Sequence, residues 1–203
     1  MAWNLPRVRS LGKYEERASE YSGRKKPYKL GQGSNRRLFF PQAKEGGEEV
    51  DYGYKGKGVT IHLLVEGNGM ALAVISTRAS AGEREQVPKL LKQVKVRNGK
   101  GRPRSNPKEI HPDKGYDSKA MRQSLRKKGI RPVIAKRVWP NARKAPGSKV
   151  APSKVRWVVE RGFAWLQRKF RRVVNRWERK SSFWNAFLLL SVVMLWIDKV
   201  IYG

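Results

Sequence analysis

Residues 154–180 read KVRWVVERGFAWLQRKFRRVVNRWERK, a basic run with a regular apolar pattern. They include ten Lys and Arg residues and two acids, Glu160 and Glu178. Apolar residues recur at steps of three and four, which is typical of a helix face packed on a core; they are Val159, Phe163, Leu166, Phe170, Val173 and Trp177. Glu160 lies outside this stripe, four residues after Arg156. The pattern predicts a basic helix whose lone carboxylate is placed to hold a metal ion against a polyanion.

The composition of the whole chain favours a polyanionic partner. Its 203 residues include 46 Lys and Arg against 16 Asp and Glu, a formal net charge of +30. A charge this large opposes compaction, so nucleic acid is the leading partner and an anionic membrane surface the second. The chain has no cysteine, which excludes disulfides and cysteine-ligated zinc, and two histidines argue against a His-rich metal site.

The rest of the chain predicts a mixed α/β domain. In chain order we expect strands over 59–66 and 70–77, a helix over 82–93, a helix over 119–128 and a strand over 130–135. Gly67-Asn68-Gly69 is a turn signal that joins the first two strands as a hairpin. The second helix can be capped by Asp117 or Ser118 and ended by Gly129. It connects a strand that we expect to end near Asp113 to the strand over 130–135, which predicts a parallel pair with a right-handed crossover.

The two ends of the chain differ in character. Residues 1–37 are basic and Gly/Ser-rich with little periodicity, and we expect them to be irregular. The first residues lack the apolar core of a signal peptide. Residues 182–197, SFWNAFLLLSVVMLWI, form the most apolar run, but it is shorter than the ~20 residues of a membrane span. We interpret it as a buried C-terminal helix and expect no membrane partner.

Three runs resemble the catalytic half of DDE transposases from bacterial insertion sequences of the four/five type. They are VDYGYKGKGVTIHLLVEGNG at 50–69, DKGYDSKAMRQSLRKKGIRPVI at 113–134 and VRWVVERGFAWLQRKFRRVVNRWER at 155–179. The Asp-Lys-Gly-Tyr-Asp-Ser and Arg-x-x-x-Glu motifs are specific together and weak apart. The resemblance implies an RNase H-like α/β fold, a mixed sheet flanked by helices, over residues 38–203. Residues 1–37 are not matched.

The resemblance also implies a metal site. Asp113 is the counterpart of the family's second acid and Glu160 of the third, and together they would hold Mg²⁺ or Mn²⁺. Arg156 matches the signature arginine and would orient Glu160 or a phosphate. Ser153 and Gln167 occupy the places of the signature Tyr and Lys. Without the resemblance, the sequence favours Asp113 as a turn residue and Glu160 as an ion-pair partner of Arg156 over a metal site.

The first acid of the family lies on the first strand, typically as Asp-Gly-Ser. In this chain we place that strand at Asn35-Arg36-Arg37-Leu38-Phe39-Phe40, with no acid between Glu20 and Glu45. Asp51 is the nearest replacement downstream, in the segment that leads into the next strand. We therefore interpret the chain as an N-terminally truncated or frameshifted copy with impaired catalysis.

The function implied by the resemblance is DNA transposition. The expected protein is cytoplasmic and nucleoid-associated, and it binds insertion-sequence ends and target DNA; a homo-oligomer on DNA is compatible with this. The phosphate contacts that we predict are Arg168, Lys169, Arg171, Arg172 and Arg176, although such a run can also be a solvated helix face. Two other functions stay open: a non-catalytic basic nucleic-acid-binding remnant, and an RNA-binding protein of the ribosomal type.

Overall fold

The longest strands form a hairpin at the centre of the fold. In the computed structural model, which describes residues 28–32, 40–53, 56–95, 106–134 and 153–202, β3 (Gly56–Val65) and β4 (Ala71–Arg78) pair antiparallel. The turn between them lies at Gly67-Asn68-Gly69, where Gly69 has a φ of +92° that favours glycine. Both strands and their turn confirm the pattern in the sequence.

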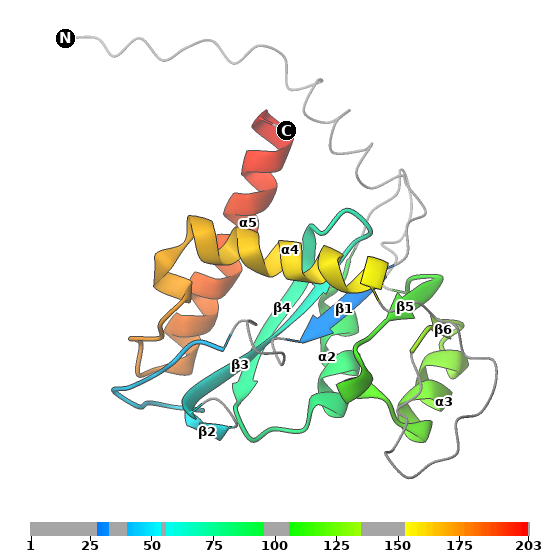
Figure 1. Cartoon of the computed structure of the whole chain (residues 1–203), viewed down its shortest axis with the longest axis horizontal. Helices are drawn as coiled ribbons and strands as arrows, with labels where there is room; N and C mark the ends of the chain where they lie inside the picture. Colours follow the sequence, from blue (N-terminus) through cyan, green and yellow to red (C-terminus); the bar gives the residue numbers. More distant parts are fainter. Residues whose placement is uncertain (1–27, 33–39, 54–55, 96–105, 135–152, 203) are drawn as a thin grey trace.

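The remaining strands of the sheet lie on the β3 side of this hairpin. β3 pairs with β4 along one edge and with β1 (Tyr28–Gln32) along the other, both antiparallel. β1 then pairs parallel with β5 (Glu109–His111), which pairs parallel with β6 (Arg131–Pro132). The strand order is therefore β4-β3-β1-β5-β6, with the short β2 (Asp51–Gly53) on the first residues of β3 (Figure 1).

The first strand differs from our expectation. β1 lies inside residues 1–37, which we expected to be irregular, and it comes before the Asn35–Phe40 segment where we placed the first strand. Of that segment, the structure describes Phe40 alone. The sequence YKLGQ gives little strand signal because it is short and contains Lys and Gly. Its strand conformation comes from pairing on both sides, which is a non-local effect.

One face of the sheet carries the 3-10 helix η1 (Glu83–Glu85), α2 (Gln86–Gln93) and α3 (Lys119–Lys127). Their apolar residues join Leu64, Ala73 and Ile110 in one core cluster. The Ser118 hydroxyl accepts a hydrogen bond from the Met121 backbone N–H at 3.1 Å, so Ser118 is the N-cap of α3. The predicted helix between two parallel strands is thus confirmed.

The other face carries α4 (Ser153–Lys169) and α5 (Ser181–Tyr202), which form a second core cluster with β3 and β4. Val159, Phe163 and Leu166 are buried as the stripe predicts. A helix through residue 180 is wrong, because α4 ends at Lys169 and the 3-10 turn η3 (Arg171–Val173) follows. Trp177, beyond that turn, is 59% exposed.

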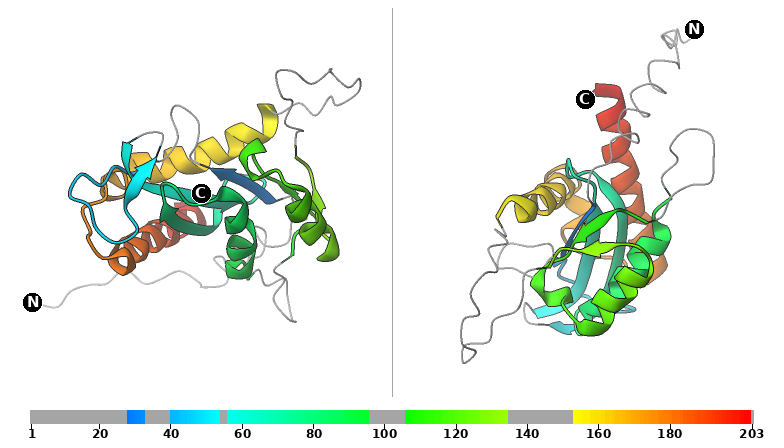
Figure 2. Two further views of the ribbon diagram at one scale, coloured as in Figure 1. Left: turned by 90° about the horizontal axis from the view of Figure 1, so that it is seen from below. Right: turned by 90° about the vertical axis from the view of Figure 1, so that its right-hand side faces the viewer.

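Only one side of α5 is buried, which corrects our expectation of a buried helix. That side consists of Trp184, Leu188, Ser191, Val192 and Leu195, whereas large apolar side chains on the opposite side are exposed. The last turns of α5 extend beyond the sheet (Figure 2). With 22 residues, α5 is long and apolar enough to cross a membrane by length and composition alone, so our argument from length does not hold.

Candidate functional site

Asp113 lies at the end of a central strand. It follows β5 where the chain turns into η2 (Lys114–Tyr116), and its carbonyl accepts a hydrogen bond from the Tyr116 N–H at 3.0 Å. β1 and β5 pair parallel with Tyr28 beside Ile110 and Lys29 beside His111. The pairing ends at His111, and its register, if continued by two residues, would bring Gly31 level with Asp113.

Gly31 belongs to the face that α4 covers. Its antiparallel partner on β3 is Leu63, which lies in the core cluster formed with α4 and α5. Neighbouring Gln32 is the register partner of His62, whose side chain contacts Tyr116 on the opposite face. The residue of β1 nearest to Asp113 on the α4 face therefore has no side chain.

Glu160 lies on α4 and is exposed, as expected for a residue outside the apolar stripe. α4 packs against β1 and β3. The element before Asp113 and the element that carries Glu160 therefore both contact β1. β5 pairs with β1 in the sheet, and α4 packs across it (Figure 1). Arg156 lies in the first turn of α4, where the structure describes the backbone only.

The rotation of α4 is fixed by close contact with the β3–β4 turn. A Cβ built on Gly162 would lie 2.9 Å from the Gly69 carbonyl oxygen and 3.2 Å from Val65 Cγ1, so only glycine fits there. Arg161 donates a hydrogen bond to the Asn68 carbonyl. These contacts, which sequence reasoning missed, keep Glu160 on the outward side; the signal for them was a glycine inside a helix together with a glycine-rich turn.

Arg161 also stacks between two tryptophans of α4. Its guanidinium carbon lies 4.3 Å from the ring centroid of Trp157 and 5.1 Å from that of Trp165. The three residues are four positions apart and so follow one another along one side of the helix. Trp157 is half exposed, so this side of α4 faces solvent at its first turns.

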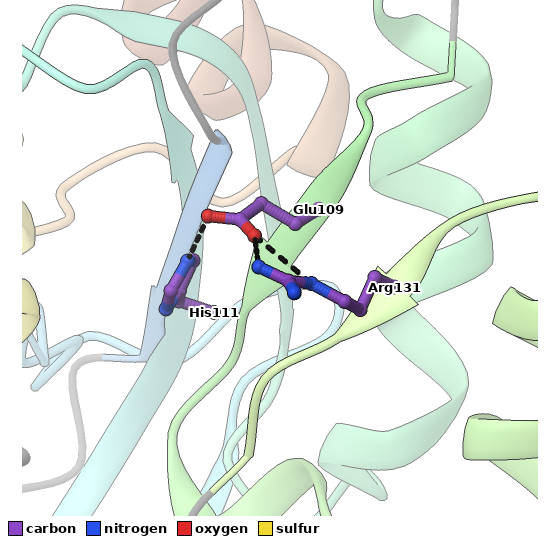
Figure 3. Close-up of polar contacts among 3 residues, drawn as sticks. All are labelled: Glu109, His111 and Arg131. Carbon is purple, nitrogen blue, oxygen red and sulfur yellow. Dashed lines mark hydrogen bonds and ion pairs between the residues drawn. The ribbon is translucent and has the colours of Figure 1, made fainter. Parts of the chain in front are cut away.

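A polar triad joins β5 to β6 just before Asp113 (Figure 3). Glu109 lies 3.0 Å from His111 Nε2 through one oxygen and accepts a hydrogen bond from Arg131 Nε at 3.1 Å through the other. The hydrogen bonds from His111 and then Arg131 hold the pKa of Glu109 below its usual value. The Glu109–Arg131 pair thus joins the two strands that precede and follow the Asp113 segment, and His111 lies in the first of them.

His62 has a structural role. It is fully buried, with Nδ1 2.8 Å from the Tyr116 hydroxyl and Nε2 2.9 Å from the Thr77 hydroxyl oxygen. Thr77 donates its own proton to the Arg78 carbonyl, so Nε2 donates to Thr77 and Tyr116 donates to Nδ1. Burial lowers the pKa of His62 to about 4, and the ring is therefore neutral at pH 7.

Asp51 is too far along the sheet to replace the first acid. It pairs with Gly58, five residues along β3 from Leu63, the partner of Gly31. At about 3.3 Å per residue, this separation is roughly 16 Å. Asp51 instead accepts hydrogen bonds from the Ser80 hydroxyl and the Tyr52 N–H, which lower its pKa.

The predicted phosphate contacts divide into two groups. Arg168, Lys169, Arg171 and Arg172 are exposed at the end of α4 and in η3. Lys169 forms an ion pair with Asp198 of α5, and Arg172 pairs with Glu178 at 2.9 Å. They therefore form a basic surface at the α4–η3 junction.

Arg176 does not belong to this surface, and its prediction as a DNA contact is wrong. Its side chain is 2% exposed, and it donates to the carbonyls of Glu178, at 2.9 Å, and Arg179, at 3.4 Å. Its backbone N–H donates to the Gln42 carbonyl. Arg176 therefore holds the loop before α5 closed.

Within the part of the chain that the structure describes, no group of three or more His, Asp or Glu side chains could hold a metal ion. The site that the described elements support thus rests on Asp113 and Glu160. Asp113 is half-buried at the end of β5 and Glu160 is exposed on α4.

Comparisons with known proteins agree with the sequence motifs. The family described as "Transposase DDE domain" matches residues 39–196. A protein of Burkholderia cepacia named "Putative transposase for insertion sequence element IS402" is 39% identical over 135 residues, 66% of this chain. The aligned region spans 60% of that relative's length. Among solved structures, a piggyBac transposase synaptic complex with hairpin DNA matches 58% of this chain and 24% of its own, at 17% identity and a TM-score of 0.30.

Proposed function

This chain belongs to the transposase DDE domain family, and from that premise we propose that it binds the ends of an insertion sequence and target DNA. The net charge of +30 and the basic surface of Arg168, Lys169, Arg171 and Arg172 support a phosphate-rich partner. The family match argues against the ribosomal-type RNA-binding alternative. We place the protein in the cytoplasm, associated with the nucleoid.

We propose that the fold is RNase H-like. The support is the sheet itself: three antiparallel strands, β4, β3 and β1, followed by two parallel strands, β5 and β6. Helices cover both faces, with α4 and α5 on one side and α2 and α3 on the other. The β1–β5 neighbourhood is where this fold brings together acids from separate strands.

Asp113 and Glu160 would hold one Mg²⁺ or Mn²⁺ ion, which would supply charge neutralisation for a phosphate. Two carboxylates on separate rigid elements suit an ion that keeps several of its waters. Arg156, one helical turn before Glu160, would orient that carboxylate or bind a phosphate oxygen. Two ions held in common by three acids are the usual arrangement for strand cleavage, and this chain fits only part of it.

The observation that supports impaired catalysis is Gly31. Extending the β1–β5 register brings this residue level with Asp113 on the α4 face, and no residue of β1, YKLGQ, has a carboxylate. Arg36 and Arg37, which belong to the segment where we expected the first strand, lie outside the described residues. We propose that the chain retains DNA binding and weak binding of one ion, with impaired strand cleavage.

Metal binding and cleavage test this proposal separately. Mn²⁺ binding, followed by electron paramagnetic resonance, should weaken at least about tenfold in both Asp113→Asn and Glu160→Gln, because each removes one of two ligands. Unchanged binding in both variants would remove the site. Cleavage of insertion-sequence ends by the unmodified chain in Mg²⁺ would show that catalysis is intact.

A further inference from the structure

The outer side of α5 carries an exposed apolar stripe. Its residues recur at steps of four and three, and all are 41–59% exposed; they are Phe183, Phe187, Leu190, Met194, Ile197 and Ile201. Steps of four and three repeat every seven residues, which is the spacing of a helix that packs on another helix in a coiled coil. The six positions span 18 residue steps (201 − 183), or roughly 27 Å of helix.

The stripe contains no charge in a chain that is 31% charged. No Lys, Arg, Asp or Glu lies between Ser181 and Ile197. Arg172 and Lys180 lie over the rings of Phe187 and Phe183 at one end, and the stripe itself offers nucleic acid or an acidic protein no charge. The stripe therefore suits a partner surface that is itself apolar and helical. The α5 helix of a second copy has such a surface with the same spacing.

A lipid bilayer does not fit the same observations. The inner side of α5 is held on the sheet, where Trp184, Leu188 and Leu195 are buried in the core. Trp196 Nε1 also donates to the Ala71 carbonyl at 2.6 Å, and Ser76 donates to Asn185 at 2.7 Å. Spanning a membrane would require all of these contacts to break. Contact with lipid would also not require residues at steps of four and three.

The area available is sufficient for a specific dimer. Large apolar side chains that are about half exposed leave roughly 50–120 Å² each, so the stripe, with Val193 at its edge, offers on the order of 600 Å² per copy. A pair would then bury ~1,200 Å², the lower end of stable interfaces. Monomers rarely expose a larger apolar patch.

We propose that this chain forms a homodimer through α5, with the stripe of Phe183, Phe187, Leu190, Met194, Ile197 and Ile201 packed on the same stripe of a second copy. The inference goes beyond the proposed function, because it requires neither DNA nor metal. The dimer would bring two basic α4–η3 surfaces into one particle. Repulsion between two chains of +30 opposes it, so salt or bound DNA favours it.

Light scattering of the full chain, freed of nucleic acid, tests the dimer. At roughly 1 M salt, where the Debye length is about 3 Å, we expect a mass twice the 23.3 kDa of one chain. Leu190→Glu, at the centre of the stripe, should raise the dimer Kd at least ~tenfold. Leu189→Glu is the matched control: Leu189 is 58% exposed against 54% for Leu190 but lies about 100° around the helix, so its dimer should persist.

A monomeric full chain at this salt concentration would overturn the proposal, as would equal dissociation of both variants, which would indicate unspecific apolar association. Because the chain has no cysteine, Leu190→Cys and Leu189→Cys give a second measurement that does not depend on a buried charge. Oxidation should cross-link the first variant and not the second. DNA binding by Leu190→Glu, measured in parallel, separates failure of the dimer from failure of the proposed function.

Discussion

Gly31 is the residue on which the candidate site most depends. An aspartate there would enter from the strand beside Asp113, on the face that α4 covers, and would add a third carboxylate to Asp113 and Glu160. We predict that Gly31→Asp raises Mn²⁺ affinity at least about tenfold and makes strand cleavage measurable in Mg²⁺. Titration calorimetry and cleavage of end-sequence DNA would measure the two effects.

The control for that variant is one residue away. Gln32→Asp adds the same carboxylate, but position 32 pairs with the buried His62 on the opposite face and should give no gain. The sequence contains a competing signal, because Gln32-Gly33-Ser34 keeps the last two residues of the family's Asp-Gly-Ser. Rescue by Gln32→Asp alone would mean that β1 is shifted by one residue from the register described.

His62 should make stability depend on pH in a defined window. Its pKa is about 4 in the folded protein and 6.5 when unfolded, so between these values the unfolded chain binds a proton that the folded chain does not. Stability is therefore fully present above pH 6.5 and falls as the pH drops towards 4, by up to about 3 kcal/mol. Urea unfolding from pH 4 to 7 would measure this; a His62→Gln variant with the same slope would exclude His62 as its source.

At the scale of elements, local signals decided what the sequence could predict. The β3–β4 hairpin and α3 were predictable because a glycine turn and a serine cap lie next to clear periodic segments. β1 was missed because its pairing partners are distant in sequence. The end of α4 was missed for a different reason: Val173 remains buried after the helix ends, so the apolar spacing continues through the 3-10 turn.

The candidate site was predictable to a similar extent. The end of a strand at Asp113 and the outward position of Glu160 followed from local pattern. The burial of Arg176 did not, because an arginine is buried only when nearby carbonyls satisfy it, and those of Glu178 and Arg179 converge through the loop's fold. In α5, apolar residues occur on all sides, so hydrophobicity could not distinguish the buried side from the exposed stripe.

The contact between α4 and the hairpin turn gives a test at this scale. Gly162→Ala would place a methyl 2.9 Å from the Gly69 carbonyl oxygen and should cost about 1–3 kcal/mol of unfolding free energy. Gly82→Ala is the control, because its Cβ meets nothing within 4 Å and its φ is −63°. It should be neutral or stabilise by up to ~1 kcal/mol. Equal destabilisation in urea unfolding would contradict the close packing of α4.

At the scale of the whole molecule, some basic side chains are buried or paired within the fold and others are exposed on its surface. Arg176 is buried, and Arg131 is paired with Glu109, yet exposed Arg168 and Arg171 adjoin the site helix. The basic surface at the α4–η3 junction lies on the same layer as Glu160, whereas the basic end of α3 lies on the opposite face of the sheet. A DNA duplex bound for chemistry at Asp113 and Glu160 would therefore contact the first surface and not the second.

DNA binding should be steeply dependent on salt, because each phosphate neutralised by the protein releases counterions. We predict that changing Arg168, Arg171 and Arg172 together to Ala weakens binding to all duplex sequences alike and reduces the slope of log K against log salt by roughly 0.9 per lost contact, up to about 2.7. The matched control changes Arg126, Lys127 and Lys128, three exposed basic residues of the α3 end, to Ala. Fluorescence anisotropy with a random duplex at several salt concentrations would measure both. If the α3 variant loses as much slope as the α4–η3 variant, the binding is a diffuse effect of net charge and the α4–η3 junction is not the DNA surface.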